Sequence, residues 1–205
     1  SLRSDINRLM SNLFQKLELE AFRAGINPRT QESREWFRKR IQKLTRVNRD
    51  ALMREDEINR RASHSYGSMF MYFYDPKHKD KLPFYDRFPL TIPVEPAPGG
   101  FRGINLHYLP PVLRAKFLDA LLDATNNKKY DESTRFKLTY DLLKGARKMR
   151  YFQPCFKHYL LAHVKSRFAE VPAPEWEIAA FLPTAQWEKA SAGTVYQNSR
   201  MKVNG

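Results

Sequence analysis

The sequence has one cysteine, Cys155, among its 205 residues, so an internal disulfide is excluded and a reducing compartment is favoured. It has no apolar run approaching the ~20 residues that a membrane-spanning helix needs, and no signal-peptide pattern near its start. The glycines at 99, 100 and 103 lack the Gly-Lys-Ser/Thr ending of a phosphate-binding loop. We therefore expect no membrane contact and no nucleotide-binding loop of this kind.

Acidic residues are few relative to basic ones. There are 36 Lys and Arg against 22 Asp and Glu, a formal net charge of +14. Such a charge opposes folding by self-repulsion and is typical of proteins with an anionic partner, most often nucleic acid. Docking on acidic protein surfaces is the alternative. The excess is concentrated in residues 1–62 (15 basic, 9 acidic) and 111–170 (13 basic, 6 acidic), and the remaining residues are nearly neutral.

The segment 1–62 predicts a basic helical arm or hairpin. Apolar residues recur at helical spacing at Leu2, Ile6, Leu9, Leu13 and Leu17. A second helix is expected from about Thr30 to about Arg61, with arginines and lysines crowding its polar side. Few compact domains need so long a helix. We expect the arm to pack on the C-terminal half or on a second subunit, which would make a homo-oligomer.

Three extended segments follow. Residues 69–74 form an aromatic run of strand length, residues 88–94 a second run interrupted by prolines, and residues 101–108 alternate apolar and polar side chains. They predict a small antiparallel sheet of two or three strands.

The remaining segments read as helices. One begins at Pro110-Pro111 and ends near Thr125, a second is capped by Asp131 or Ser133, a third opens at Pro154 and a fourth at Pro174. From about Ser191 the composition becomes polar and predicts a loose tail. The fold class expected is α+β and mostly helical: the arm, the small sheet and a C-terminal helical bundle. The expected division is 1–62, a core at 63–190 and a tail at 191–205.

Two basic groups are candidate nucleic-acid contacts. Lys144, Arg147 and Lys148 share one helix face, where a row of cations suits the phosphates of a nucleic-acid backbone. The full set of candidates is Lys144, Arg147, Lys148, Arg150, Lys157, Lys165 and Arg167, with Lys77, Lys79 and Lys81 in a lysine-rich turn. A solvated helix face and a solvated turn are the open alternatives.

No complete catalytic or metal site is found in the sequence. Asp75-Pro76-Lys77 has the acid-x-lysine spacing of some metal-dependent nucleases, but its companion acids Asp80 and Asp86 lie in proline-punctuated loops. The five histidines lack the spacing of zinc hydrolases, and His107 is expected to be packed in the core. We expect neither enzymatic activity, nor a catalytic residue, nor a metal or other cofactor.

Three stretches are distinctive: Tyr72 to Leu90 (YFYDPKHKDKLPFYDRFPL), Gly99 to Pro111 (GGFRGINLHYLPP), and Tyr130 to Pro183 with its blocks FQPC and WEIAAFLP. They resemble a family of virion proteins encoded by T4-like tailed phages, the DNA end-protectors, which act in head completion. The resemblance covers roughly residues 66–190. It leaves the arm outside and supplies no functional residue.

The resemblance implies a non-enzymatic virion protein that sits on the ends of packaged double-stranded DNA and shields them from host exonuclease. It also implies contacts with other virion proteins and a passage through the host cytoplasm during assembly. The alternative is a structural protein of the tail, baseplate or neck that touches only protein. Binding to DNA ends would weaken steeply with salt, because neutralising phosphates releases counterions.

Overall fold

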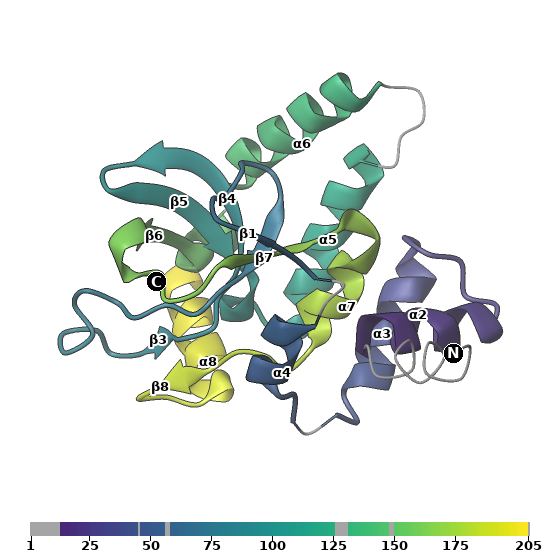
Figure 1. Cartoon of the computed structure of the whole chain (residues 1–205), viewed down its shortest axis with the longest axis horizontal. Helices are drawn as coiled ribbons and strands as arrows, with labels where there is room; N and C mark the ends of the chain where they lie inside the picture. The colour runs from purple at the N-terminus through teal and green to yellow at the C-terminus, as the bar shows by residue number, and fades with distance from the viewer. Residues whose placement is uncertain (1–12, 45, 56–57, 126–130, 148–149, 205) are drawn as a thin grey trace.

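The computed structural model describes residues 13–44, 46–55, 58–125, 131–147 and 150–204. In this part of the chain, six strands form one antiparallel sheet in the order β1-β7-β2-β4-β5-β6, and β3 and β8 form a separate two-stranded ribbon. Helices pack against one face of the sheet (Figure 1). The strands are β1 (Asn59–Arg61), β2 (Met69–Met71), β3 (Tyr85–Asp86), β4 (Leu90–Ala97), β5 (Gly100–Asn105), β6 (Phe156–Leu160), β7 (Phe168–Val171) and β8 (Trp187–Glu188).

The helices of the described residues come from both ends of the chain and from its middle. They are α2 (Leu13–Arg23), α3 (Gln31–Ile41), α4 (Arg49–Arg54), α5 (Pro111–Thr125), α6 (Glu132–Arg147), α7 (Trp176–Phe181) and α8 (Ala192–Asn204). Short 3-10 turns connect them to the strands: η1 (Leu106–Tyr108), η2 (Arg150–Cys155), η3 (Leu161–His163) and η4 (Ala173–Glu175). None of the helices in the described ranges is long and apolar enough to cross a membrane.

The prediction of one long helix over residues 30–61 is wrong. α3 begins at a capping box, in which Thr30 accepts a hydrogen bond from the N–H of Ser33 and Ser33 bonds back to Thr30. It ends at Ile41, and a new helix starts at α4, where the side chain of Asn48 accepts from the N–H of Ala51. The chain then enters the sheet as β1, which pairs with β7. Asn48 thus caps a new helix within a stretch whose amphipathic pattern is continuous, and two helices form where one was expected.

The expected helical bundle after Pro154, and the sheet of only two or three strands, are also wrong. The protein is a mixed α+β fold in which the predicted third C-terminal helix is replaced by η2, β6, η3 and β7. β6 pairs with β5 and β7 pairs with β2, which places Tyr159 and Phe168 on the same sheet face as Phe101 and Tyr72. Burying these aromatic side chains together outweighs the helical spacing of the segment. The predicted loose tail is mostly α8.

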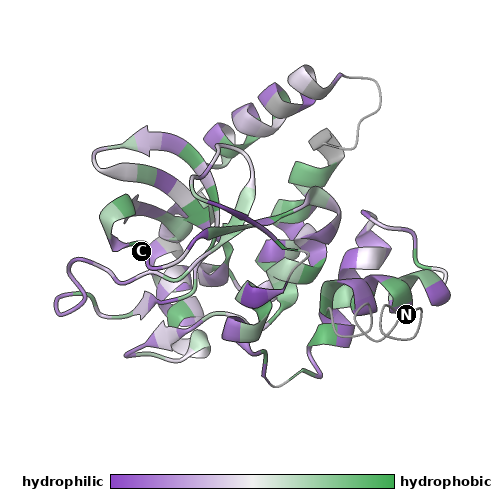
Figure 2. Cartoon of the chain, viewed as in Figure 1, coloured by the Kyte–Doolittle hydropathy of each residue, from purple (hydrophilic) through white to green (hydrophobic). Residues whose placement is uncertain are grey.

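The two faces of the sheet carry different cores. One face packs against α5 and α7 and is aliphatic, and Figure 2 shows the apolar residues concentrated there, whereas the loop between β2 and β3 is largely hydrophilic. The other face holds an aromatic cluster: Phe70, Tyr72, Tyr74, Phe101, Tyr159 and Phe168. The ring centroids of Phe101 on β5 and Phe168 on β7 lie 6.3 Å apart, although β2 and β4 run between these strands. The sheet is therefore strongly curled around the cluster.

The aromatic run at 69–74 is core and not an exposed stacking platform, because Phe70 and Tyr72 are fully buried. The β4–β5 hairpin turns at Pro98-Gly99, where Gly99 has a φ of +73° that favours glycine. Gly100 follows because a side chain there would collide with the Tyr159 carbonyl of β6. The division of the chain at residues 62 and 190 stays a prediction.

Candidate nucleic-acid interface

β6 is an edge strand of the sheet, and two of its residues, Lys157 and His158, line two adjoining hollows. We call the first the basic groove, of about 750 Å³. It lies between α6 and the β5–β6 edge and is lined by Glu95, Arg102, Lys144, Arg147, Gln153, Phe156, Lys157 and His158. Five of these side chains are basic or histidine and one is acidic, so the groove favours an anion.

Glu95 organises the basic groove. Its carboxylate forms ion pairs with Arg147 of α6 and with Arg102 of β5, the latter at 3.3 Å between Nη1 and Oε1. The ammonium of Lys144, one turn before Arg147, lies 4.6 Å from the ring centroid of Tyr140. The arginines are therefore held in place before any ligand arrives, and each guanidinium keeps further N–H donors for a phosphate.

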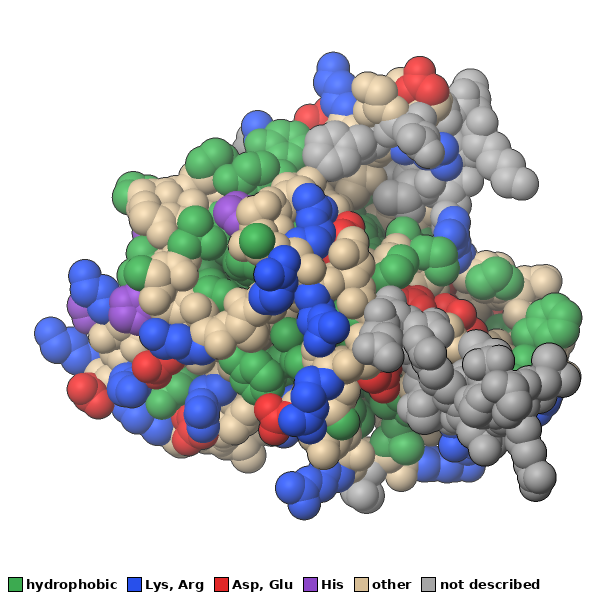
Figure 3. Space-filling view, viewed as in Figure 1, with side chains coloured by type: hydrophobic (Ala, Val, Ile, Leu, Met, Phe, Trp, Pro, Cys, Tyr) green, Lys and Arg blue, Asp and Glu red, His purple; other side chains and the backbone are tan. Residues whose placement is uncertain are grey.

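The second hollow, the aromatic pocket, has a volume of about 550 Å³ and lies between the β2–β3 loop, β6 and the end of α8. Its lining combines rings, among them Tyr74, Phe84 and Tyr108, with the cations Lys77, Lys157 and Lys202. The Lys157 ammonium lies 4.1 Å from the ring centroid of Tyr108. Burial, with a smaller contribution from nearby Lys202, lowers the pKa of Lys157 to about 8. Figure 3 shows basic and histidine side chains gathered over the β2–β3 loop.

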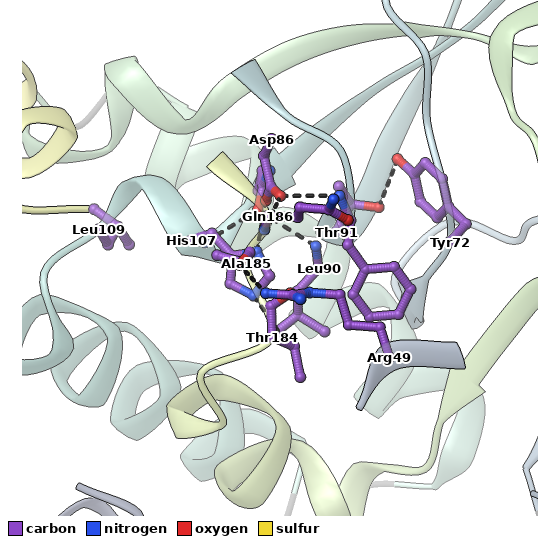
Figure 4. A network of polar contacts seen from close by, with 12 residues as sticks. Arg49, Tyr72, Asp86, Leu90, Thr91, His107, Leu109, Thr184, Ala185 and Gln186 are labelled. Carbon is purple, nitrogen blue, oxygen red and sulfur yellow. Dashed lines mark hydrogen bonds and ion pairs between the residues drawn. The ribbon is translucent and has the colours of Figure 1, made fainter. Parts of the chain in front are cut away.

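A buried polar network lies behind the aromatic pocket (Figure 4). The Asp86 carboxylate accepts hydrogen bonds from the N–H groups of Phe88 and Gln186, both at 3.0 Å, and from the Asn105 side chain at 3.1 Å. It also accepts from His107 Nδ1 at 2.6 Å, which leaves His107 Nε2 to accept from the hydroxyl of Thr184 at 3.3 Å.

Asp86, His107 and Thr184 have the order of a nucleophilic triad, but all three are buried. Burial lowers the pKa of His107 and so favours its neutral form. Burial alone would raise the pKa of Asp86, but His107 and the backbone donors hold it below its usual value. The network joins β3, η1 and the segment before β8, and its role is to fix the loops that form the pocket. The structure thus places His107 in the core, as the sequence predicts.

Two arginines complete this framework. Arg114 of α5 donates to the carbonyls of Leu109 and Ala180, at 2.7 and 2.8 Å, and to the hydroxyl of Tyr196 at 2.7 Å. Arg49 of α4 donates to the carbonyls of residues 184 and 185. Both guanidinium groups are used by the protein itself, so they are not ligand contacts.

The family model of the Phage T4 terminal DNA protecting protein matches residues 3–204. The chain belongs to this family. The match includes the N-terminal helices, which the resemblance seen in the sequence alone did not reach. No curated protein and no solved structure matches the chain.

Membership in this family indicates the general role of the protein. The family consists of structural phage proteins that protect DNA, it is virion-associated, and it is not known for catalysis. The alternative of a tail or baseplate component gains no support from the match. The acidic residues of the nuclease-like pattern have other contacts. Asp75 pairs with Lys79 at 3.2 Å, and Asp86 is buried in its hydrogen-bond network. In the part of the chain that the structure describes, no group of three or more His, Cys, Asp or Glu could hold a metal.

The structure brings together some of the predicted contact residues of this family member. Lys144, Arg147 and Lys157 meet in the basic groove, and Lys77 joins Lys157 at the aromatic pocket. Lys79 is paired with Asp75, and Lys81 is exposed but lines neither hollow.

Other predicted residues lie elsewhere. Lys165 and Arg167 are exposed between η3 and β7 and line neither hollow. They share no helix with Lys157, because the helix expected to open at Pro154 does not form. Lys148 and the side chain of Arg150 lie outside the described residues. Cys155 ends η2 and starts no helix, and burial raises its pKa to about 12, so it is an unreactive thiol.

Sequence reasoning missed Arg102, His158 and Lys202. Arg102 pairs in register with His158 across the β5–β6 ladder, which could be recognised only once β6 is known to be a strand. Lys202 lies in a segment with no net charge, where composition gives no signal.

Proposed function

We propose that this protein binds the ends of double-stranded phage DNA through the basic groove and aromatic pocket and thereby blocks exonucleases, without cutting DNA itself. The observation that carries the proposal is the convergence of Arg102, Lys144, Arg147 and Lys157 at one sheet edge in a member of a DNA protecting family. An exonuclease must engage a free terminus before it can cleave. A protein that occupies the terminus therefore needs no chemistry to protect it.

The arrangement of the cations suits a nucleic-acid backbone. Lys144 and Arg147 lie one turn apart on α6, opposite Arg102 on β5, so positive charge lines both sides of the groove. Contacts of this kind fix the position of a duplex without reading its sequence. The groove adjoins the aromatic pocket at Lys157. A continuous duplex offers no free end that could enter this pocket.

The test is protection of linear duplex DNA from a processive exonuclease by the full chain. The pair Lys144→Gln with Arg147→Gln removes two groove charges, and Lys165→Gln with Arg167→Gln removes two charges away from the groove. We expect wild type and the second pair to protect. The groove pair should lose protection at moderate salt. Its slope of log affinity against log salt should be smaller in magnitude by about 2 than that of wild type.

If wild type leaves linear DNA unprotected, the proposed function is wrong. If both pairs lose protection equally, the charge acts without a defined interface and the groove assignment is wrong.

Contacts with other virion proteins, passage through the host cytoplasm and self-association through residues 1–62 stay predictions. Phe22 on α2 is 80% exposed and is the position at which Phe22→Ser would test self-association by sedimentation.

A further inference from the structure

The aromatic pocket differs from the basic groove in what it offers a ligand. Its walls come from the β2–β3 loop, β6, η1 and α8, and they present ring faces and edges as well as ammonium groups. Its volume of about 550 Å³ falls within the range of roughly 300–1,000 Å³ in which small-molecule sites occur. It can therefore hold a single nucleotide but not a duplex.

Among the residues that the structure describes, the lysines of the pocket form no ion pair with a carboxylate. Lys157 is half-buried, and within the described residues no carboxylate forms an ion pair with it. Asp86, the acidic residue of the lining, already accepts from two backbone N–H groups and two side chains. Lys77 and Lys202 add charge at the rim. A half-buried ammonium without a counter-ion favours an anionic ligand.

The rings supply a second kind of contact. Phe84 lies 6.2 Å from Tyr108, measured between ring centroids, and Trp187 packs edge-on against both. Bases stack on such aromatic side chains regardless of their identity, because every base has a π-face. The Tyr74 hydroxyl accepts from the N–H of Leu160 at 2.9 Å, so its own hydrogen remains able to donate.

The loop that carries Lys77 and Phe84 is anchored. Lys189, next to β8, donates from its ammonium to the carbonyls of Lys79 and Leu82, at 2.6 and 3.0 Å. Lys189 has a φ of +71°, which shows that the surrounding structure dictates its conformation. The wall of the pocket is thus formed before a ligand binds, and this lowers the entropic cost of binding.

We propose that the aromatic pocket binds the phosphorylated terminal nucleotide of a DNA strand, with the phosphate at Lys157, Lys77 and Lys202 and the base against the half-buried ring of Phe84. This rests on the proposed function and deepens it. An internal nucleotide is stacked and paired on both sides, whereas a terminal one is stacked on one side and frays readily. The pocket therefore selects ends, while the neighbouring groove holds the duplex that follows.

The experiment uses short duplexes closed by a hairpin at one end, whose open end carries a 5′-phosphate, a 3′-phosphate or neither. A dumbbell closed at both ends has no terminus. Affinities are measured with the full chain at one salt concentration. We expect one phosphorylated end to bind on the order of tenfold more tightly than the unphosphorylated end, and the preferred phosphate to identify the strand that enters the pocket.

Lys157→Met, which keeps the aliphatic stem, should bring this ratio to about one, whereas the matched control Lys165→Met should leave it unchanged. Lys202→Met, at an exposed position, should also reduce the ratio, and this variant provides the test if Lys157→Met fails to fold. Equal affinity for all open ends, or a ratio that survives both pocket variants, would overturn the inference. Equal affinity for the dumbbell and the open ends would instead overturn the proposed function.

Discussion

Three arginines, Arg34, Arg49 and Arg114, differ from Lys157 of the aromatic pocket in what they contact. Arg34, Arg49 and Arg114 are each engaged by the protein: Arg34 pairs with Asp119 and Glu177, and the other two donate to backbone carbonyls. Lys157 contacts a tyrosine ring and no acceptor among the described residues. Net charge alone does not locate an interface, because cations that the protein itself engages in its interior, such as Arg114, are not available to an outside anion.

The difference follows from side-chain chemistry. A guanidinium presents five donors in a planar fork and can join several carbonyls at once, as Arg114 does between α5, η1 and α7. An ammonium on a flexible stem suits a point contact with a phosphate. Arg49 and Arg114 thus stabilise the junctions between elements, and Lys157 stays available at the sheet edge.

The largest expected effect tests the arginine side of this comparison. Arg114→Met leaves the carbonyls of residues 107, 109 and 180 without their donor in the core, and we expect it to lower the free energy of unfolding by about 3–5 kcal/mol. Lys157→Met should change it by less than about 1 kcal/mol. Urea unfolding monitored by tryptophan fluorescence measures both. Similar losses in the two variants would mean that Lys157 is also structural.

A second prediction concerns the edge that carries Lys157. In Gly100→Ala the new Cβ would lie 1.8 Å from the Tyr159 carbonyl oxygen, so β5 and β6 must separate locally. We expect a loss of roughly 2–4 kcal/mol in unfolding free energy and weaker binding to DNA ends. In Gly145→Ala on α6, where no neighbour lies within 4 Å of the new atom, we expect a gain of about 0.5–1 kcal/mol. Unfolding curves that rank the two variants the other way would refute the tight β5–β6 approach.

The smallest effect is a pH dependence. The pKa of Lys157 is about 8 in the folded protein, below the 10.5 of a free lysine, so its charge is complete well below pH 8 and is lost as pH rises through 8. Affinity for DNA ends should therefore fall between pH 7 and pH 9 in wild type and stay nearly constant in Lys157→Met. The unfolded chain keeps the proton up to about pH 10.5, so this group adds stability as pH rises from 8 to 10.5. A wild-type affinity independent of pH over this range would contradict the burial of Lys157.

Parts of the fold could be predicted from local sequence. The helix from Pro111 to Thr125 and the Asp131 cap, whose carboxylate accepts from the N–H of Thr134, follow from proline placement and capping chemistry. The strands β2, β4 and β5 follow from aromatic runs and alternation. The α6 face bearing Lys144 and Arg147 follows from helical spacing.

The remaining elements depend on contacts far along the chain. Phe156, Tyr159 and Leu160 have spacings that fit a helix, and they form a strand because Tyr159 reaches the aromatic cluster beside Phe101, with ring centroids 5.6 Å apart. Lys202 reaches the aromatic pocket only because α8 docks beside η1 and η2. Tertiary packing of this kind leaves no periodic pattern in the segment itself.

The most direct test of the central claim is competition between linear and covalently closed circular duplex DNA of the same length and sequence for the full chain. We predict that linear DNA displaces a labelled end-bearing duplex at concentrations at least about tenfold lower than circular DNA does, and that the groove pair Lys144→Gln with Arg147→Gln weakens both. Equal competition by the linear and the circular molecules would contradict end recognition.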